Sequence, residues 1–223
     1  RRRPARTEHE LREPRVIVEL GHFALILALV VAGVQMVVPA YGAWRRDGRL
    51  MAIGEPAALS QFALLMAAFI ALGHAFVTSD FSVANVFQNS HSAKPMIYKI
   101  SGVWGNHEGS MLLWVLILAL FGAAVAAFGN NLPATLKANV LAVQAWISTA
   151  FLLFILLTSN PFIRLDPAPA EGRDLNPVLQ DVGLAIHPPL LYLGYVGLSV
   201  CFSFAVAALI EGRIDAAWAR WVR

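Results

Sequence analysis

The chain alternates between long apolar runs and shorter polar stretches. Five apolar runs lie near residues 16–41, 56–77, 110–129, 138–158 and 188–210. A helix rises 1.5 Å per residue, so about 20 apolar residues suffice to cross the hydrocarbon core of a bilayer. The pattern predicts an all-α, polytopic integral membrane protein with about five transmembrane helices.

The polar stretches divide these runs into a simple order. Residues 1–15 form a charged tail, which we expect to lie outside the fold as a disordered or upstream segment. Residues 43–53 are a short basic loop and 129–133 a tight turn, whereas 78–106 and 159–186 are longer connections. Within the first long connection, residues 81–87 are predicted to form a short helix on the membrane surface.

Composition agrees with a membrane protein. The 223 residues are 58% hydrophobic and 14% charged, whereas soluble domains carry about 25% charged residues. The net charge of +3 arises in residues 1–15, which hold six Arg and three Glu, and the remaining acidic and basic residues cancel. The basic balance is therefore local and gives no support for a nucleic-acid binder. The one cysteine, Cys201, excludes an internal disulfide, a CxxC redox pair and a cysteine zinc site.

Lys and Arg in the connecting loops predict the orientation, because cytoplasmic loops are enriched in both. One set of ends carries seven basic residues in short segments, namely Arg45, Arg46, Arg49, Lys137, Arg213, Arg220 and Arg223. The other carries four in two longer loops, namely Lys94, Lys99, Arg164 and Arg173. We expect the first set to be cytoplasmic, which places both long loops outside.

His187 is the candidate metal ligand, because it stands immediately before two prolines at the edge of the last apolar run. Proline favours the first turn of a helix and disfavours helical geometry in the residue before it. We therefore expect the helix to begin at Pro188 or Pro189, with His187 just outside it. The helix dipole would then favour neutral imidazole, the form that binds haem iron. The alternative is a histidine at the membrane interface that makes an ordinary hydrogen bond.

A second group of candidates opens the third run, on the same side as His187. Trp104 fits an interfacial aromatic belt. The neighbouring His107 and Glu108 could act as a ligand, a proton relay or a helix cap. Trp114 lies about 15 Å further along, too deep for the belt, so it packs between helices or against a flat ligand. In the next loop, Arg173 could pair with a haem propionate, although turn chemistry also explains that segment.

Six separated motifs occur together in this chain. They lie at 18–24 (VELGHFA), 74–83 (HAF with DFSV), 104–114 (WGNHEGSMLLW), 158–162 (TSNPF), 171–177 (EGRDLNP) and 187–197 (HPPLLYLGYVG). In order and spacing, residues 17–223 resemble the N-terminal part of the CcmF family of cytochrome c-type biogenesis proteins. That family is the haem-lyase subunit of the system I maturation pathway. The resemblance implies that residues 16–223 are the N-terminal transmembrane region of a larger haem-handling membrane protein.

The resemblance carries specific expectations about the site. It matches His187 to the first of two outer-face histidines that hold substrate haem b through its iron, and it assigns no catalytic residue. Candidate neighbours of that haem are Trp104, His107, Glu108, Trp114, Arg173, Pro188, Pro189 and Tyr192. The second histidine, a tryptophan-rich outer loop and the ligands of a membrane-embedded haem lie outside this chain.

The resemblance also implies an activity and a set of partners. The complete protein would attach haem to the CxxCH motifs of apocytochrome c at the periplasmic face of the bacterial inner membrane. This chain alone is expected to be inactive. The expected partners are a haem chaperone of the CcmE type, a thiol-reducing subunit of the CcmH type and the C-terminal remainder of the protein. The alternatives are another haem-handling protein, such as a haem exporter or delivery protein, and a non-catalytic scaffold of the maturation complex.

Overall fold

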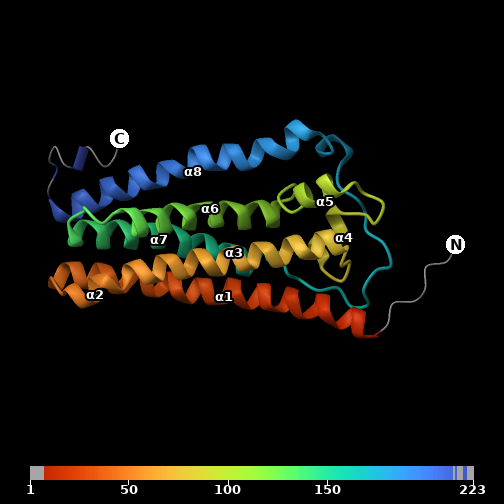
Figure 1. The fold of residues 1–223 in the computed structure, drawn as a ribbon, viewed down its shortest axis with the longest axis horizontal. Helices are drawn as coiled ribbons and strands as arrows, with labels where there is room; N and C mark the ends of the chain where they lie inside the picture. The colour runs from red at the N-terminus through yellow and green to blue at the C-terminus, as the bar shows by residue number, and fades with distance from the viewer. Residues whose placement is uncertain (1–7, 213, 215–217, 220–223) are drawn as a thin grey trace.

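Five long helices run side by side in the computed structural model, which describes residues 8–212, 214 and 218–219 (Figure 1). The helices that are long and apolar enough to cross a membrane are α1 (Glu8–Arg45), α3 (Gly54–Thr78), α6 (His107–Phe128), α7 (Ala134–Thr158) and α8 (Val182–Glu211). The short helix α2 (Gly48–Ala52) leads into α3 and is part of its candidate span. No strand occurs among the described residues, so the prediction of an all-α protein with five spans is confirmed.

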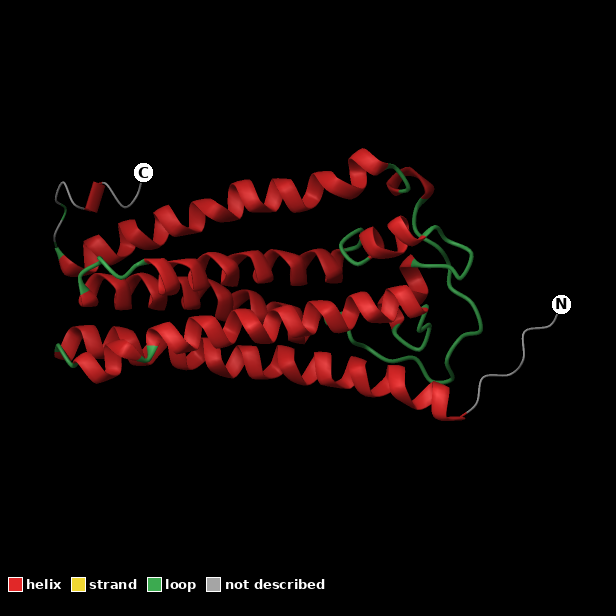
Figure 2. Cartoon of the chain, in the orientation of Figure 1, coloured by secondary structure: helices red, strands yellow, loops and turns green. Residues whose placement is uncertain are grey.

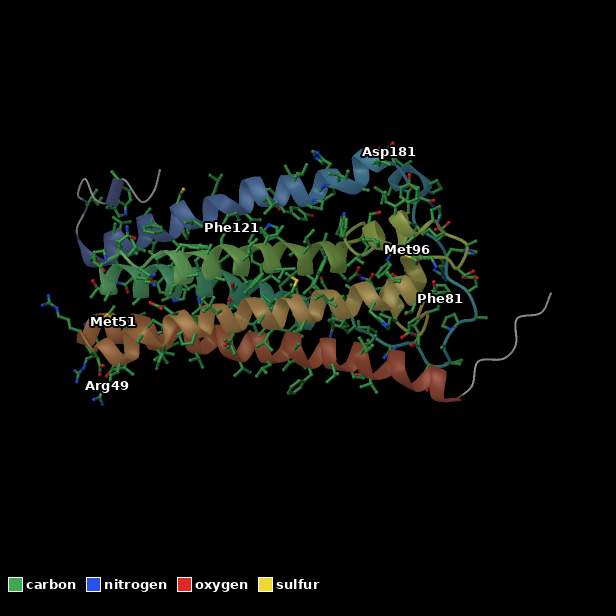
Figure 3. The ribbon with its side chains drawn as sticks, in the orientation of Figure 1. Arg49, Met51, Phe81, Met96, Phe121 and Asp181 are labelled. Carbon is green, nitrogen blue, oxygen red and sulfur yellow. The ribbon has the colours of Figure 1, made fainter. Side chains whose placement is uncertain are left out.

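The two ends of the bundle differ (Figure 2). One end has tight connections, including the turn 129–133. The other, which we call the loop end, has long connections that contain α4 (Ala84–Asn89), α5 (Met96–Gly102) and the short 3₁₀ helix η1 (Pro177–Leu179). The side chains of Arg49 and Met51 lie at the first end, and those of Phe81, Met96 and Asp181 at the loop end (Figure 3). The two predicted groups of connections therefore do lie at opposite ends of the bundle.

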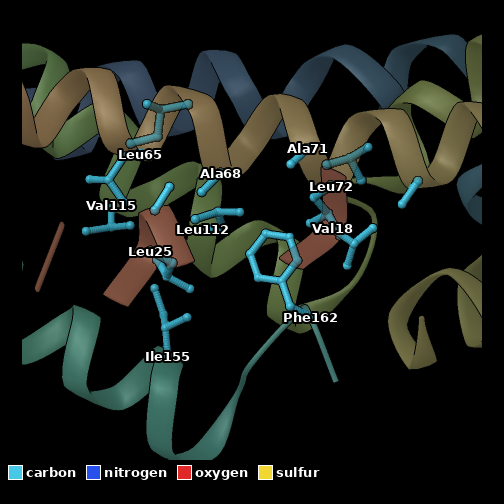
Figure 4. Packing of buried hydrophobic residues seen from close by; sticks show 14 of the residues in the cluster. Val18, Leu25, Leu65, Ala68, Ala71, Leu72, Leu112, Val115, Ile155 and Phe162 are labelled. Atoms are coloured by element: carbon cyan, nitrogen blue, oxygen red, sulfur yellow. The ribbon is translucent and has the colours of Figure 1, made fainter. Parts of the chain in front are cut away.

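The main core lies between α1, α3, α6 and α7. Small residues of α3, such as Ala68 and Ala71, alternate with large ones and let the helices approach closely (Figure 4). Phe162, from the loop after α7, enters the same core and is 3% exposed. This loop residue ties the loop end to the bundle, because fully burying a Phe side chain contributes roughly 1.5–3 kcal/mol.

The structure differs in detail from three local predictions. Helix α1 begins at Glu8, inside the segment 1–15 that was set aside as a tail; residues 1–7 lie outside the described residues. The segment 43–53 is mostly helical, because α1 continues to Arg45 and α2 follows after a short turn. A short helix does form near residues 81–87, but it is α4 (Ala84–Asn89) and it does not lie on the surface, because Phe81, Val83 and Val86 are buried in the main core.

Helix α8 is the least enclosed of the long helices. It packs on α6 and α7 at one edge of the bundle (Figure 1), with Phe121 of α6 against the backbone of Gly197. Of its most apolar window, only 28% is buried, against 56% for α6. Within this chain, α8 is therefore held mainly by its contacts with α6 and α7.

Two glycines of α1 test this packing. A Cβ atom at Gly21 would lie 2.5 Å from the Cβ of Ala71, whereas one at Gly33 would meet nothing within 4 Å. We expect Gly21→Ala to lower the stability of the purified protein by about 1–3 kcal/mol, as overpacking usually does. Gly33→Ala is the matched control and should leave the midpoint of thermal unfolding in detergent unchanged or higher. Equal midpoints for the two variants would contradict the close approach of α1 and α3.

Candidate functional site

The start of α8 differs from the prediction. The helix begins at Val182, and Asp181 is its N-cap, with its carboxylate accepting a hydrogen bond of 3.1 Å from the Leu184 amide. Both prolines, Pro188 and Pro189, lie inside the helix. The prediction failed because it gave more weight to the restriction that proline places on the preceding residue than to the capping signal of Asp181, whereas in the structure the cap decides where the helix starts. Asp is among the strongest N-cap residues, so the signal was present in the sequence.

The two prolines interrupt the hydrogen bonding of α8. Proline has no N–H, so the carbonyl groups four residues earlier, on Leu184 and Ala185, lose their helical donors. The indole Nε1–H of Trp104 donates to the Ala185 oxygen at 2.8 Å. The Trp104 ring stacks on Phe69 of α3, with 6.4 Å between ring centroids. Trp104 is therefore a bridge between α3 and the first turns of α8 rather than a simple member of an aromatic belt.

His187 lies in the second turn of α8 and is exposed. Within the described part of the chain, neither ring nitrogen of His187 has a hydrogen-bond partner, so both are open to an external ligand. The dipole argument loses most of its force, because the effect of a helix terminus fades after the first turn. The imidazole is available as a metal ligand through its exposure and its lack of partners, and not through its position at a helix start.

A pocket of about 330 Å³ lies beside this helix, between α8, the start of α6 and η1. It contains four of the predicted site residues. Its lining consists of Ser101, Trp104, Gly105, Asn106, His107, Ser110, Leu175, Leu179, Leu184, Ala185, Pro188 and Tyr192. His187 does not line it. One residue of helical rotation separates His187 from Pro188, so the imidazole occupies a neighbouring face of α8.

His107 and Glu108 have separate surroundings. The cap of α6 is Asn106, whose side-chain oxygen accepts from the Gly109 amide at 2.8 Å, so neither residue is the predicted helix cap. His107 Nε2 lies 2.9 Å from the Ser159 hydroxyl, which ties α6 to the end of α7. The Glu108 carboxylate lies in the first turn of α6, where it is favourable to the helix dipole.

Neither Trp114 nor Arg173 lines the pocket beside α8. The Trp114 ring stacks on Phe151 of α7 with 3.9 Å between centroids, so it packs between helices as one of its two predicted roles required. The Arg173 guanidinium lies over the Phe87 ring, 5.2 Å from its centroid, and remains exposed. Its backbone amide donates to the Phe87 oxygen at 2.7 Å, which attaches this loop to α4.

Arg164 joins three segments at the loop end. It donates to Glu19 of α1 at 3.0 Å, to Asp80 after α3 at 3.1 Å and to the Ser82 hydroxyl at 2.5 Å. Nearby, His22 of α1 lies 3.0 Å from the Asn160 side chain and stacks on Phe162. These contacts hold the loop after α7 to α1 and α3 and give that side of the loop end a fixed position.

Hydrogen bonds to Glu171 and an ion pair of Asp174 hold residues 171–174 to the loop before α5. Glu171 accepts hydrogen bonds from the Ser92 amide at 2.9 Å and the Ser92 hydroxyl at 2.5 Å. Partial burial alone would raise the pKa of Glu171, but the hydrogen bonds from Ser92 and the Gly172 amide outweigh it and lower that pKa to about 2. The buried Lys94 ammonium donates to the Asn89 oxygen and lies 3.6 Å from Asp174. Burial lowers the pKa of Lys94, and the Asp174 carboxylate partly opposes that shift.

The described residues hold no group of three His, Cys, Asp or Glu side chains that could bind a metal ion. A closed metal centre is therefore not formed within this part of the chain. The porphyrin fills the four equatorial positions of a haem iron, so the iron requires only one or two axial ligands from the protein. The exposed, unpartnered imidazole of His187 fits that smaller requirement.

Comparison with known proteins identifies the family. A profile of the family described as "Cytochrome C assembly protein" matches residues 104–222. A CycK biogenesis protein of Rhizobium meliloti (strain 1021) is 73% identical over 208 residues, covering 93% of this chain and 31% of the relative. CcmF proteins of Pseudomonas aeruginosa and Escherichia coli (strain K12) are 59% and 49% identical and are each covered to 32%. The chain thus spans about a third of the length of these relatives.

A solved structure titled "Cytochrome c Heme Lyase CcmF" has the same fold. It superposes with a TM-score of 0.81 at 29% sequence identity, covering 92% of this chain and 32% of the other. The resemblance predicted from the six motifs is confirmed, since the matched relatives carry the names CcmF and CycK. The chain belongs to the cytochrome c assembly protein family.

Proposed function

We propose that this chain is part of a haem lyase that attaches haem covalently to the CxxCH motifs of apocytochrome c. The observation that carries the proposal is the exposed, unpartnered His187 at the loop end of a bundle that shares its fold with a cytochrome c haem lyase. In this role His187 is an axial ligand of the substrate haem b. The neighbouring pocket is lined by Trp104 and Tyr192, and Trp104 also donates a hydrogen bond to Ala185 in the first turn of this helix.

The proposed reaction is the addition of a thiol to a vinyl group. The cysteine sulfur forms a bond to the carbon next to the porphyrin ring, its proton goes to the terminal carbon and the vinyl double bond is consumed. No oxidant is required, but both thiols must be reduced beforehand. A ligand that binds iron along the axis leaves the edge of the haem, with its two vinyl groups, open to the apocytochrome.

The remaining parts of the site are proposed to come from other sequence. The chain spans about a third of its relatives. We propose that the second outer-face histidine, the tryptophan-rich loop and the ligands of the membrane-embedded haem belong to the rest, as the family resemblance implies. The single cysteine cannot serve as a dithiol reductant. We therefore propose a thiol-reducing partner of the CcmH type and a haem-delivering chaperone of the CcmE type.

We propose that the protein spans the bacterial inner membrane with its loop end in the periplasm. The basic residues Arg45, Arg46, Arg49 and Lys137 gather at the opposite end, which supports a cytoplasmic position for that end. The periplasm is also where apocytochrome thiols and haem would meet. The alternatives are a haem exporter, a delivery protein and a non-catalytic scaffold.

Orientation can be tested by labelling single cysteines in a Cys201→Ser background. We expect a cysteine at Asp166, an exposed loop-end residue, to react with a membrane-impermeant maleimide added to intact cells. A cysteine at Gly48, at the other end, should react only after the membrane is opened. The reverse pattern would contradict the periplasmic position of His187.

The chain by itself should produce no holocytochrome, because it supplies one of the proposed haem ligands. Co-expression with the remaining two thirds of a CcmF relative should restore covalent attachment, measured as haem that stays with cytochrome c after denaturation. Cytochrome maturation by this chain alone would place the site elsewhere. Attachment that survives loss of the chain from the complete system would favour a scaffold role.

His187 is the direct test of the site. In the complete protein, we expect His187→Ala to reduce haem loading by about tenfold or more, because even the partners of metal ligands are worth that much. Exogenous imidazole should restore part of the loading by occupying the vacant axial position. Loading and the axial-ligand absorption spectrum are measured at equal protein level.

Two controls separate ligation from folding in this experiment. Ile186→Ala changes an exposed neighbour on α8 and should leave haem loading unchanged. His22→Ala removes a histidine that is bonded to Asn160 and should not alter the axial-ligand spectrum. Wild-type loading with an unchanged spectrum in the His187→Ala protein would rule out His187 as the ligand.

A further inference from the structure

The segment that carries His187 is separated from the rest of α8 by two missing hydrogen bonds. Pro188 and Pro189 cannot donate to the carbonyl groups of Leu184 and Ala185, so two successive steps of the helical ladder are absent immediately after His187. A proline in a helix interior costs about 3 kcal/mol and commonly produces a kink. The turns from Val182 to His187 therefore need support from outside the helix to keep one orientation.

Trp104 supplies a donor at this point. Its Nε1–H lies 2.8 Å from the Ala185 oxygen, which is the acceptor that Pro189 leaves without a helical partner. Ala185 is 5% exposed, so without Trp104 its carbonyl would sit in a buried environment with a lost bond. A buried carbonyl without a partner costs roughly 1–3 kcal/mol.

The Trp104 side chain is itself held in place. Its ring stacks on Phe69, a residue of α3 packed against the main core, and it follows the buried residues Ser101 to Val103. By contrast, exposed apolar side chains cover the outer face of this part of α8, including Val182, Ile186 and Leu190. The first turns of α8 are thus held on the buried side, through Ala185, against rotation about the helix axis. His187 lies on the exposed side of the same turns.

We propose that Trp104 is a positioning residue for His187: its indole N–H replaces the backbone hydrogen bond that Pro189 removes. The bond fixes the rotation of the first two turns of α8 and thereby the direction of the His187 imidazole. The relation to haem rests on the proposed function, whereas the replacement of the backbone bond can be measured without haem. The apparent haem affinity falls by the fraction of molecules in which α8 starts in the competent orientation.

A double-mutant cycle tests this replacement. Trp104→Phe keeps an aromatic ring against Phe69 and removes the donor. Pro189→Ala returns a backbone N–H that can donate to the Ala185 oxygen, so the indole becomes redundant. The four proteins, all in the complete haem lyase, are wild type, the two single variants and the double variant.

Two measurements are made on each protein. Hydrogen exchange of the amides between Val182 and His187 in haem-free protein reports whether the start of α8 opens. Titration with haem b reports affinity, and the axial-ligand spectrum reports whether His187 is bound. Peptides from α7 serve as the exchange control, because Trp104 makes no hydrogen bond to that helix among the described residues.

The expected result is a loss that depends on Pro189. Trp104→Phe should speed exchange at the start of α8 by about fivefold, because the loss of one hydrogen bond of about 1 kcal/mol shifts the opening equilibrium by that factor, and it should weaken haem binding by up to about fivefold. In the Pro189→Ala background, the same change should have less than half of this effect on both readouts. Exchange in α7 should stay the same.

Three results would overturn the proposal. An equal loss in both backgrounds would mean that Trp104 acts through packing or as a wall of the pocket. Unchanged exchange and affinity in Trp104→Phe would mean that the hydrogen bond positions nothing. Faster exchange with unchanged affinity would mean that the hydrogen bond from Trp104 holds the start of α8 but has no role in haem binding. The His187→Ala protein, measured in parallel, distinguishes failure of the proposed function from failure of the role of Trp104. If His187→Ala abolishes haem binding and Trp104→Phe does not weaken it, the proposed function stands and only the role of Trp104 fails.

Discussion

A buried backbone carbonyl that loses its helical donor must find another donor within the protein, because an unpaired buried polar group is costly, and Ala185 is such a residue. The pair of prolines in α8 creates this requirement close to His187, and the answer comes from a distant part of the chain. Trp104, which precedes α6 by three residues, donates to Ala185 at 2.8 Å. The start of α8 is therefore part of the tertiary structure of the loop end and does not behave as an independent helix terminus.

Contacts between distant segments also hold the long loops in place, although these loops contain little regular secondary structure. Arg164 bonds to α1 and to the turn after α3, while Phe162 fills the core between those helices. Glu171 and Lys94 attach the next part of the loop to the segment around α5. One side of the loop end is thus fixed by ionic and apolar contacts, whereas the α8 side relies on a cap, an indole and a few apolar neighbours.

Hydrophobic patterning predicted the number and order of the spans, because a run of apolar residues of sufficient length has one stable arrangement in a bilayer. It could not predict the start of α8. Local rules for Asp181 and for Pro188 point to different starts, and the tertiary bond from Trp104 favours the earlier one. The burial of residues 81–86 could not be predicted from the sequence either, because a short apolar segment can lie on a membrane surface or in a core. The hydrogen bond between His107 and Ser159 joins residues 52 positions apart, so no local sequence pattern could predict it.

The position of His187 in a helix interior changes how its orientation must be controlled. Metal-binding histidines usually donate their second ring nitrogen to a carboxylate or carbonyl group, which fixes the ring. No such partner contacts His187 among the described residues. Control must then come from the backbone, through the rotation of the helix that carries the residue. The proline pair immediately after His187 removes two hydrogen bonds between that short segment and the rest of α8, and the indole of Trp104, in the turn between α5 and α6, replaces one of them. In the proposed positioning role, the direction of the imidazole depends on the surroundings of Trp104, which lies between α5 and α6 and stacks on Phe69 of α3, and less on the long, exposed body of α8.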